Sequence, residues 1–89
     1  MKTLFTQSEI KDTIKTYIQQ EFLYDKPEFD LEDDSLLIEE DIIDSLGIFV
    51  LISFLDEQFQ AKLRPDEVVI ENFANLNTLT CLVMGKLNQ

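Results

Sequence analysis

Residues 41–59 read DIIDSLGIFVLISFLDEQF and carry the strongest structural signal in this 89-residue chain. From Ser45 to about Gln60 the apolar residues recur at helical spacing, and Asp44 stands where a helix N-cap is expected. One stripe of this helix forms the expected core face, made of Ile48, Leu51, Ile52, Leu55 and Phe59. Four other apolar residues lie largely outside that stripe: Leu46, Phe49, Val50 and Phe54. A helix in so small a chain cannot bury every side, so we expect part of this surface to meet a partner.

Two further helices are predicted, one on each side of this stretch. Thr6 and Glu9 have capping-box spacing, and a helical pattern follows over about residues 7–23, until Pro27 disfavours the helical conformation at the residue before it. A last helix is predicted over about 76–87, with Leu79, Leu82, Val83 and Leu87 facing inward. Pro65 and the acids after it favour a first helical turn, and residues 71–74 a second. The predicted fold is one all-α domain, residues 1–89, with three main helices and a short third helix.

A long acidic connection, residues 24–43, joins the first two predicted helices. It contains nine acidic residues and one basic residue, Lys26. It also carries too many apolar residues for a disordered linker: Phe29, Leu31, Leu36, Leu37, Ile38, Ile42 and Ile43. We therefore expect an ordered loop with its apolar residues inward and its acids outward, which leaves room for a helical turn within 35–39.

Charge and composition restrict the classes of function. Eighteen acidic and seven basic residues give a net charge of −11, which repels nucleic acid and anionic membrane surfaces and attracts basic protein patches. The chain has no histidine, which removes histidine-based acid–base catalysis and most zinc sites. The single cysteine, Cys81, cannot form an intramolecular disulfide, which fits a reducing cytoplasm. The longest apolar run, residues 48–52, is too short to span a bilayer.

The tripeptide Asp44-Ser45-Leu46 is the candidate functional motif. Alone it is weak, because Asp and Ser are favoured N-cap residues and the motif is then explained as a helix start. Its position adds weight, since a hydroxyl at a helix N-terminus projects beside unpaired backbone N–H groups, a place that suits a phosphodiester. The chain offers no base of suitable pKa to make Ser45 a hydrolytic nucleophile. Ser45 is therefore interpreted as a covalent tether, and the protein as a non-enzyme.

The pattern resembles a known family, the acyl and peptidyl carrier proteins. The resemblance rests on the run from Leu36 to Gly47, which includes Asp44-Ser45-Leu46, and on the apolar helix that ends in Phe54-Leu55-Asp56-Glu57-Gln58-Phe59. The Asp66-Glu67 and Glu71-Asn72-Phe73 runs are similar to the third-helix region of freestanding carriers that work beside adenylating enzymes. The resemblance covers about residues 6–87 and implies a four-helix, acyl-carrier-protein-like bundle. It also implies 4′-phosphopantetheine attached to Ser45 by a phosphopantetheinyl transferase, with acyl or aminoacyl cargo held as a thioester.

The same resemblance implies that helix 45–60 and the loop before it dock partner enzymes, through Leu46, Phe49, Val50, Ile43 and Asp41. Asp44 is expected beside the arm, where it caps the helix and holds a hydroxyl or metal-bound phosphate during modification. Fatty-acid carriers usually have acids where Phe49 and Val50 stand here, so docking should depend on apolar contact with acidic steering. This favours a monomeric carrier in specialised, non-ribosomal peptide or polyketide-type biosynthesis. Its partners would be an adenylating or acyl-loading enzyme and downstream synthase or tailoring enzymes.

Three alternatives stay open at the sequence level. One is a housekeeping fatty-acid acyl carrier protein, and another is an acidic, non-catalytic adaptor for a basic partner. The third is weak calcium binding, because Asp30, Glu32, Asp34 and Asp41 occupy positions 1, 3, 5 and 12 of a 12-residue loop. Ser35 replaces the glycine that such a loop needs at position 6, so no metal site is assigned. Elsewhere, Cys81 is expected to be a core thiol, and Tyr17 and Tyr24 packing residues.

Overall fold

The computed structural model describes residues 5–26 and 28–87 of the chain. Three α-helices are present, α1 (Gln7–Phe22), α2 (Ser45–Phe59) and α3 (Leu76–Leu87), and no strand occurs in these two ranges. Two 3₁₀ turns, η1 (Pro65–Glu67) and η2 (Ile70–Phe73), connect α2 to α3. The predicted all-α fold and the three main helices are confirmed, each bound within one residue of its prediction. Where the sequence predicts a short third helix, the structure has the two separate 3₁₀ turns.

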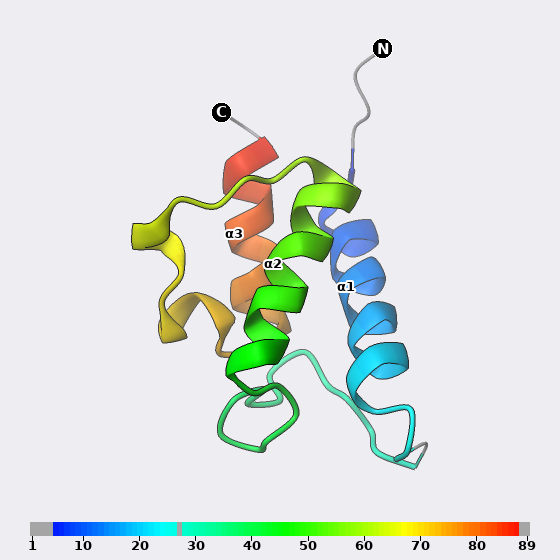
Figure 1. Cartoon of the computed structure of the whole chain (residues 1–89). Helices are drawn as coiled ribbons and strands as arrows, with labels where there is room; N and C mark the ends of the chain where they lie inside the picture. Colours follow the sequence, from blue (N-terminus) through cyan, green and yellow to red (C-terminus); the bar gives the residue numbers. More distant parts are fainter. Residues whose placement is uncertain (1–4, 27, 88–89) are drawn as a thin grey trace.

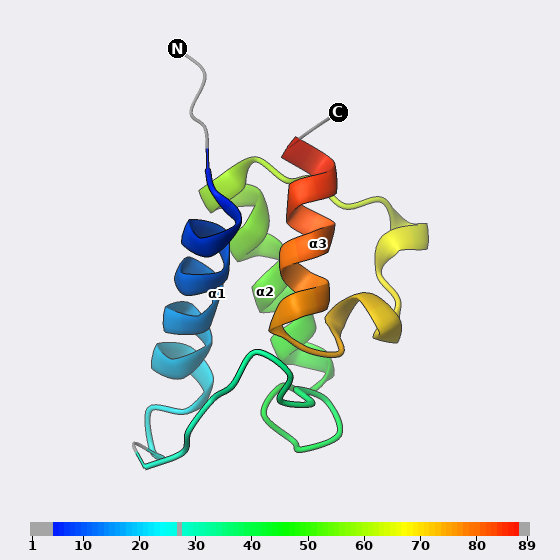
Figure 2. The ribbon, with the colours of Figure 1, turned by 180° about the vertical axis from the view of Figure 1, so that it is seen from behind.

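The helices form a compact bundle around one core (Figures 1 and 2). α1 runs antiparallel to α2 and α3, so that α1 ends where α2 begins (Figure 1). Each helix contributes a buried apolar stripe, formed by Ile10, Ile14 and Ile18 of α1, Leu51, Leu55 and Phe59 of α2, and Leu76, Leu79 and Val83 of α3. The spacing of these residues is the helical period that the sequence shows. Ile48 and Ile52, predicted as core, are only partly buried.

Local capping explains where the helices begin. At α1, Thr6 Oγ1 accepts the Glu9 N–H at 3.1 Å, and Glu9 Oε1 accepts the Thr6 N–H at 2.9 Å, which completes the predicted capping box. At α3, Asn75 Oδ1 accepts the Thr78 N–H at 2.9 Å, so Asn75 is the cap. Each cap satisfies an N–H that would otherwise lack a partner in the first turn.

A row of aromatic rings fills the seam between α1 and α2. The rings of Tyr17 and Phe54 stack at a centroid distance of 3.7 Å with an interplanar angle of 12°. Phe22 meets Tyr17 edge-on at 6.4 Å, and Phe5 meets Phe59 edge-on at 5.0 Å. Phe54 therefore packs against α1, whereas the sequence pattern places it in the surplus outer surface. Tyr17 has the predicted packing role, but Tyr24 is 76% exposed and does not.

The acidic loop (residues 24–43) is ordered in its described part and crosses the end of the bundle where α1 ends and α2 begins (Figure 1). Four of its apolar residues, Leu31, Leu37, Ile42 and Ile43, are buried as predicted, whereas Phe29 and Ile38 are partly buried and Leu36 is 40% exposed, contrary to the prediction. The backbone of the loop is bonded to the body, because the Leu37 N–H donates to the Ala74 carbonyl at 2.9 Å. Asp33 is held twice, by Lys11 at 3.2 Å and by the Asn77 N–H at 3.2 Å. The loop is therefore a fixed part of the fold.

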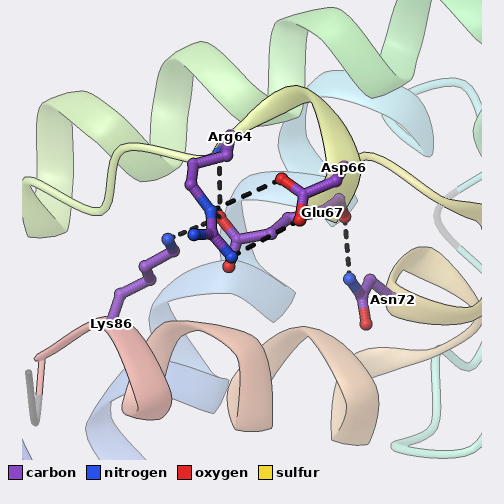
Figure 3. A network of polar contacts seen from close by, with 5 residues as sticks. All are labelled: Arg64, Asp66, Glu67, Asn72 and Lys86. Atoms are coloured by element: carbon purple, nitrogen blue, oxygen red, sulfur yellow. Dashed lines mark hydrogen bonds and ion pairs between the residues drawn. The ribbon is translucent and has the colours of Figure 1, made fainter.

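The segment between α2 and α3 is attached by a polar network centred on Glu67 (Figure 3). Between Ala61 and Phe73, which are both buried, no residue of this described segment is buried. The Glu67 carboxylate accepts the Arg64 N–H at 2.8 Å and pairs with the Lys86 ammonium of α3. Asn72 Nδ2 donates to the Glu67 carbonyl at 2.7 Å. The Glu67 network thus connects η1 to η2 and to the last turn of α3.

Two other features bear on the sequence predictions. Cys81 is exposed, so its expected role as a core thiol is wrong. It lies on the face of α3 opposite the buried Leu79, and its position on the helix, not the apolar character of the thiol, decides its exposure. In the described residues, no helix has the length and apolar character needed to cross a membrane.

Candidate functional site

Ser45 is the first residue of α2, and Asp44 is its N-cap. Asp44 has extended backbone angles, φ −103° and ψ −171°, and its Oδ1 accepts the Gly47 N–H at 2.8 Å. The capping bond is therefore made by Asp44, and the Ser45 side chain is not needed for it. Ser45 itself is exposed. The arrangement places a primary hydroxyl in solvent at a defined position on a rigid helix.

The backbone at this helix start favours an anionic substituent. The Asp44 side chain accepts the Gly47 N–H, and the Asp44 carbonyl accepts the Ile48 N–H at 3.0 Å, which is the first backbone bond of the helix. The N–H groups of Ser45 and Leu46 precede that first bond and have no intrahelical acceptor. Those groups and the helix dipole stabilise an anionic group attached to the Ser45 oxygen. The surrounding acids oppose a free anion, so a covalently attached phosphate fits this place better than a diffusible one.

Gly47 is a site residue to which the sequence analysis assigns no role. A Cβ atom at this position would lie 2.8 Å from Ile43 Cγ2 and 2.9 Å from Phe22 Cε1. Glycine is therefore required for the first turn of α2 to approach both the end of α1 and the end of the acidic loop. A glycine inside a predicted helix costs about 1 kcal/mol of helix stability relative to alanine. An unexplained glycine in the first turn of a predicted helix is therefore the sequence feature that could have indicated a close contact at Gly47.

The apolar residues predicted to dock partners are exposed on α2. Leu46 is 74% exposed, Phe49 65% and Val50 42%. Their i, i+3, i+4 spacing places them on one face of the helix, immediately after Ser45. Asp41 is also exposed, in a left-handed backbone conformation with φ 60°. Three neighbouring exposed apolar side chains beside the candidate attachment point are a feature typical of interaction sites.

Ile43 does not belong to this surface, which corrects its prediction as a docking residue. Its side chain is only 1% exposed, and its N–H donates to the Leu37 carbonyl at 3.0 Å. The reason is tertiary, because the end of the acidic loop folds under the first turn of α2 and brings Ile43 against Gly47. Ile43 packs on the inner side of the first turn of α2, which carries Ser45, and its side chain is not available to a partner.

The sequence reasoning also missed two exposed apolar residues on the segment between η1 and η2. Val69 is exposed, and so is its neighbour Ile70 at the start of η2. The sequence prediction of two short helical turns in this segment assigns neither residue to the core or to the surface. The 3₁₀ turns instead direct both outward, and only Phe73 of this segment is buried.

The charges around the site are almost all of one sign. No basic residue occurs between Lys26 and Lys62, whereas eleven acidic residues do. Among the residues that the structure describes, no three or more acidic or cysteine side chains converge on a point that would hold a metal ion. Ser35 Oγ accepts the Glu32 N–H at 3.0 Å, so this part of the acidic loop is closed by its own hydrogen bonds. The acids therefore provide an extended negative surface.

No family of known proteins, no curated protein and no solved structure matches the chain. The functional argument therefore depends on the residues of this site and on their geometry.

Proposed function

We propose that the chain is a carrier protein, which holds acyl or aminoacyl groups as thioesters on a 4′-phosphopantetheine arm attached to Ser45. The observation that carries the proposal is the exposed hydroxyl of Ser45 at the first position of α2, next to a cap that Asp44 makes alone. A four-helix carrier-type architecture is part of the proposal, with η1 and η2 in the place of the short third helix.

The chain's own part in the attachment reaction is to present the nucleophilic oxygen. Ser45 Oγ attacks the β-phosphorus of coenzyme A, the pyrophosphate bond breaks, and 3′,5′-ADP leaves. The hydroxyl proton goes to a base of the transferase, because the carrier has no histidine and no suitable base at the site. The N–H groups of Ser45 and Leu46 then face the new phosphodiester. Once attached, the arm supplies the thiol that carries the cargo.

The surface beside Ser45 determines which enzymes dock. Leu46, Phe49 and Val50 fit an apolar pocket, and the acidic loop attracts basic residues around that pocket at longer range. Fatty-acid carriers present acids at the corresponding helix positions, so Phe49 and Val50 favour a specialised biosynthetic pathway with its own loading and tailoring enzymes. Ready loading by fatty-acid synthase enzymes, with no turnover by an adenylating enzyme encoded beside this protein, would contradict that assignment.

Modification by a promiscuous phosphopantetheinyl transferase tests the proposed function. The protein is incubated with the transferase, coenzyme A and magnesium, and its intact mass is measured. We expect one arm to be added to the wild-type chain and none to Ser45→Ala. Ser53→Ala is the matched control, because Ser53 is also an exposed serine of α2 and should not affect the reaction.

The exposed apolar face of α2 is also compatible with a second function, that of a non-catalytic adaptor that binds a basic partner. The two functions separate in the same experiment. An adaptor does not need the Ser45 hydroxyl and would gain no mass in this assay. A circular dichroism spectrum of the same sample checks that the unmodified chain is folded.

A further inference from the structure

A groove of about 370 Å³ lies along the junction of α1 and α2, away from the candidate attachment site. Its floor is the stacked pair of Tyr17 from α1 and Phe54 from α2. Phe54 is nine residues beyond Ser45, so it lies about 14 Å along the α2 axis and half a turn around it. The groove therefore lies away from Ser45, and it begins one helical turn beyond Val50 on α2.

The walls of this groove are rich in hydrogen-bond acceptors. Asp12 and Thr16 are exposed and line it on α1, and Gln58 lines it on α2. Thr13 also lines it, and because its hydroxyl proton is used on the Glu9 carbonyl at 2.8 Å, its oxygen is left to accept. Among the described residues that line the groove, none is basic. The groove thus combines an aromatic floor with walls that lack a cation of their own.

The electrostatic field at the floor is negative. Burial raises the pKa of the Tyr17 hydroxyl, and the carboxylates of Glu21 and Glu57 raise it further. The same carboxylates that disfavour a tyrosinate favour a cation near the ring. Because Asp12 adds a third carboxylate at the rim, a cationic ligand is attracted from two helices at once.

We infer that this groove is a second docking site, which binds an arginine side chain of a basic partner protein. The guanidinium group is planar, so it can lie against a face of Tyr17 or Phe54 that the stack does not cover, and its five N–H donors match the carboxylate, amide and hydroxyl oxygens of the walls. A lysine ammonium offers three donors from a single point and stacks less well. A neutral side chain gains nothing from the three carboxylates. The site does not depend on the proposed function, since no part of it involves Ser45.

The test is an NMR titration of the ¹⁵N-labelled, unmodified protein at low salt with acetyl-glycyl-arginyl-glycine amide. Matched peptides carry lysine, or the uncharged analogue citrulline, in place of arginine. We expect amide shift changes confined to residues 12–20 and 54–58, largest for arginine, smaller for lysine and absent for citrulline. Equal shifts from arginine and lysine, spread over the acidic loop, would mean general attraction to an acidic chain and would overturn the inference.

Matched variants separate the groove from the net charge. Asp12→Asn removes a carboxylate at the groove, whereas Asp34→Asn removes one from the acidic loop, and both residues are exposed, so neither change should unfold the chain. We expect Asp12→Asn to weaken arginine-peptide binding about threefold and Asp34→Asn to leave it unchanged. Phe54→Leu keeps an apolar floor without the ring, and it should abolish the preference for arginine over lysine. Equal weakening by both charge variants would also contradict the inference.

Discussion

Gly47 has an effect on stability opposite to that expected for a helical glycine. A glycine inside a helix normally weakens it, and Gly85 of α3 is of this kind, because a Cβ atom there would meet nothing within 4 Å. At Gly47 the same atom would meet Ile43 and Phe22 below 3.0 Å. Overpacking of this kind costs about 1–3 kcal/mol, which exceeds the gain of about 1 kcal/mol in helix propensity. Glycine is therefore the more stable residue at this position of the first turn of α2.

The two alanine substitutions should consequently have opposite signs. We expect Gly47→Ala to lower the free energy of unfolding by up to about 2 kcal/mol and Gly85→Ala to raise it by about 0.5–1 kcal/mol. Urea denaturation followed by circular dichroism measures both. If Gly47→Ala proved as stable as Gly85→Ala, the close approach of α1, α2 and the acidic loop at this glycine would be wrong.

At the scale of single residues, the sequence located the candidate site but not all of its surroundings. Asp44 and Ser45 were placed correctly at the N-cap and first position of α2, because capping depends on local chemistry. Ile43 was misplaced, since its burial depends on a loop that returns to Leu37 and Gly47. Cys81 was misplaced for a different reason: its residue type suggested burial, whereas its position opposite Leu79 on α3 places it in solvent.

At the scale of elements, prediction succeeded where a helix has both a cap and a period. α1, α2 and α3 each have a side-chain cap and three or more buried apolar residues at helical spacing. The segment between Ala61 and Leu76 has neither in full. Pro65 starts η1 as expected, but Val68, Val69 and Ile70 are three adjacent apolar residues where one helix face needs a spacing of three or four. Because these residues cannot all lie on the buried face of one helix, the segment forms two short 3₁₀ turns, which the Glu67 network connects.

The Glu67 network should contribute a pH-dependent part of the stability. The Arg64 backbone N–H lowers the pKa of the Glu67 carboxyl below its ordinary value of 4.5, and the Lys86 ammonium lowers it further. Because the folded pKa lies below the unfolded one, the stabilisation is fully present above pH 4.5 and is lost as the pH falls through the lowered value. Glu67→Gln removes the carboxylate and with it this dependence.

Urea denaturation of the wild type and of Glu67→Gln over a range of pH measures the effect. The difference in unfolding free energy should be largest near neutral pH and should shrink as the pH falls below 4.5. Glu71→Gln, an exposed acid of η2, is the matched control for the loss of one charge in the same segment. A difference that stays constant with pH would show that Glu67 acts through packing and not through its charge.

At the scale of the whole molecule, the dominant electrostatic feature is self-repulsion. The net charge is −11, and eleven acids lie between Lys26 and Lys62 without a compensating base. In the described residues the ion pairs involve Lys11, Arg64 and Lys86, and of these only the contact between Lys86 and Glu67 is well shielded from water. Exposed pairs are worth little, so the repulsion among unpaired acids should outweigh them. Added salt weakens both the ion pairs and the repulsion among the unpaired acids. Because the repulsion is the larger, its loss should decide the net effect of salt.

Salt should therefore stabilise the fold without discriminating between cations. Between about 0.01 M and about 0.15 M ionic strength the Debye length falls from roughly 30 Å to 8 Å, which is enough to screen charges across this molecule. We expect the unfolding free energy to rise by on the order of 1 kcal/mol, a shift of about 4–8 °C in Tm for a domain of this size. Magnesium and calcium chloride at equal ionic strength should give the same shift, because no group of acids converges in the described part of the chain. A larger effect of calcium would contradict screening as the mechanism, and it would favour instead the loop of Asp30, Glu32, Asp34 and Asp41 as a calcium site.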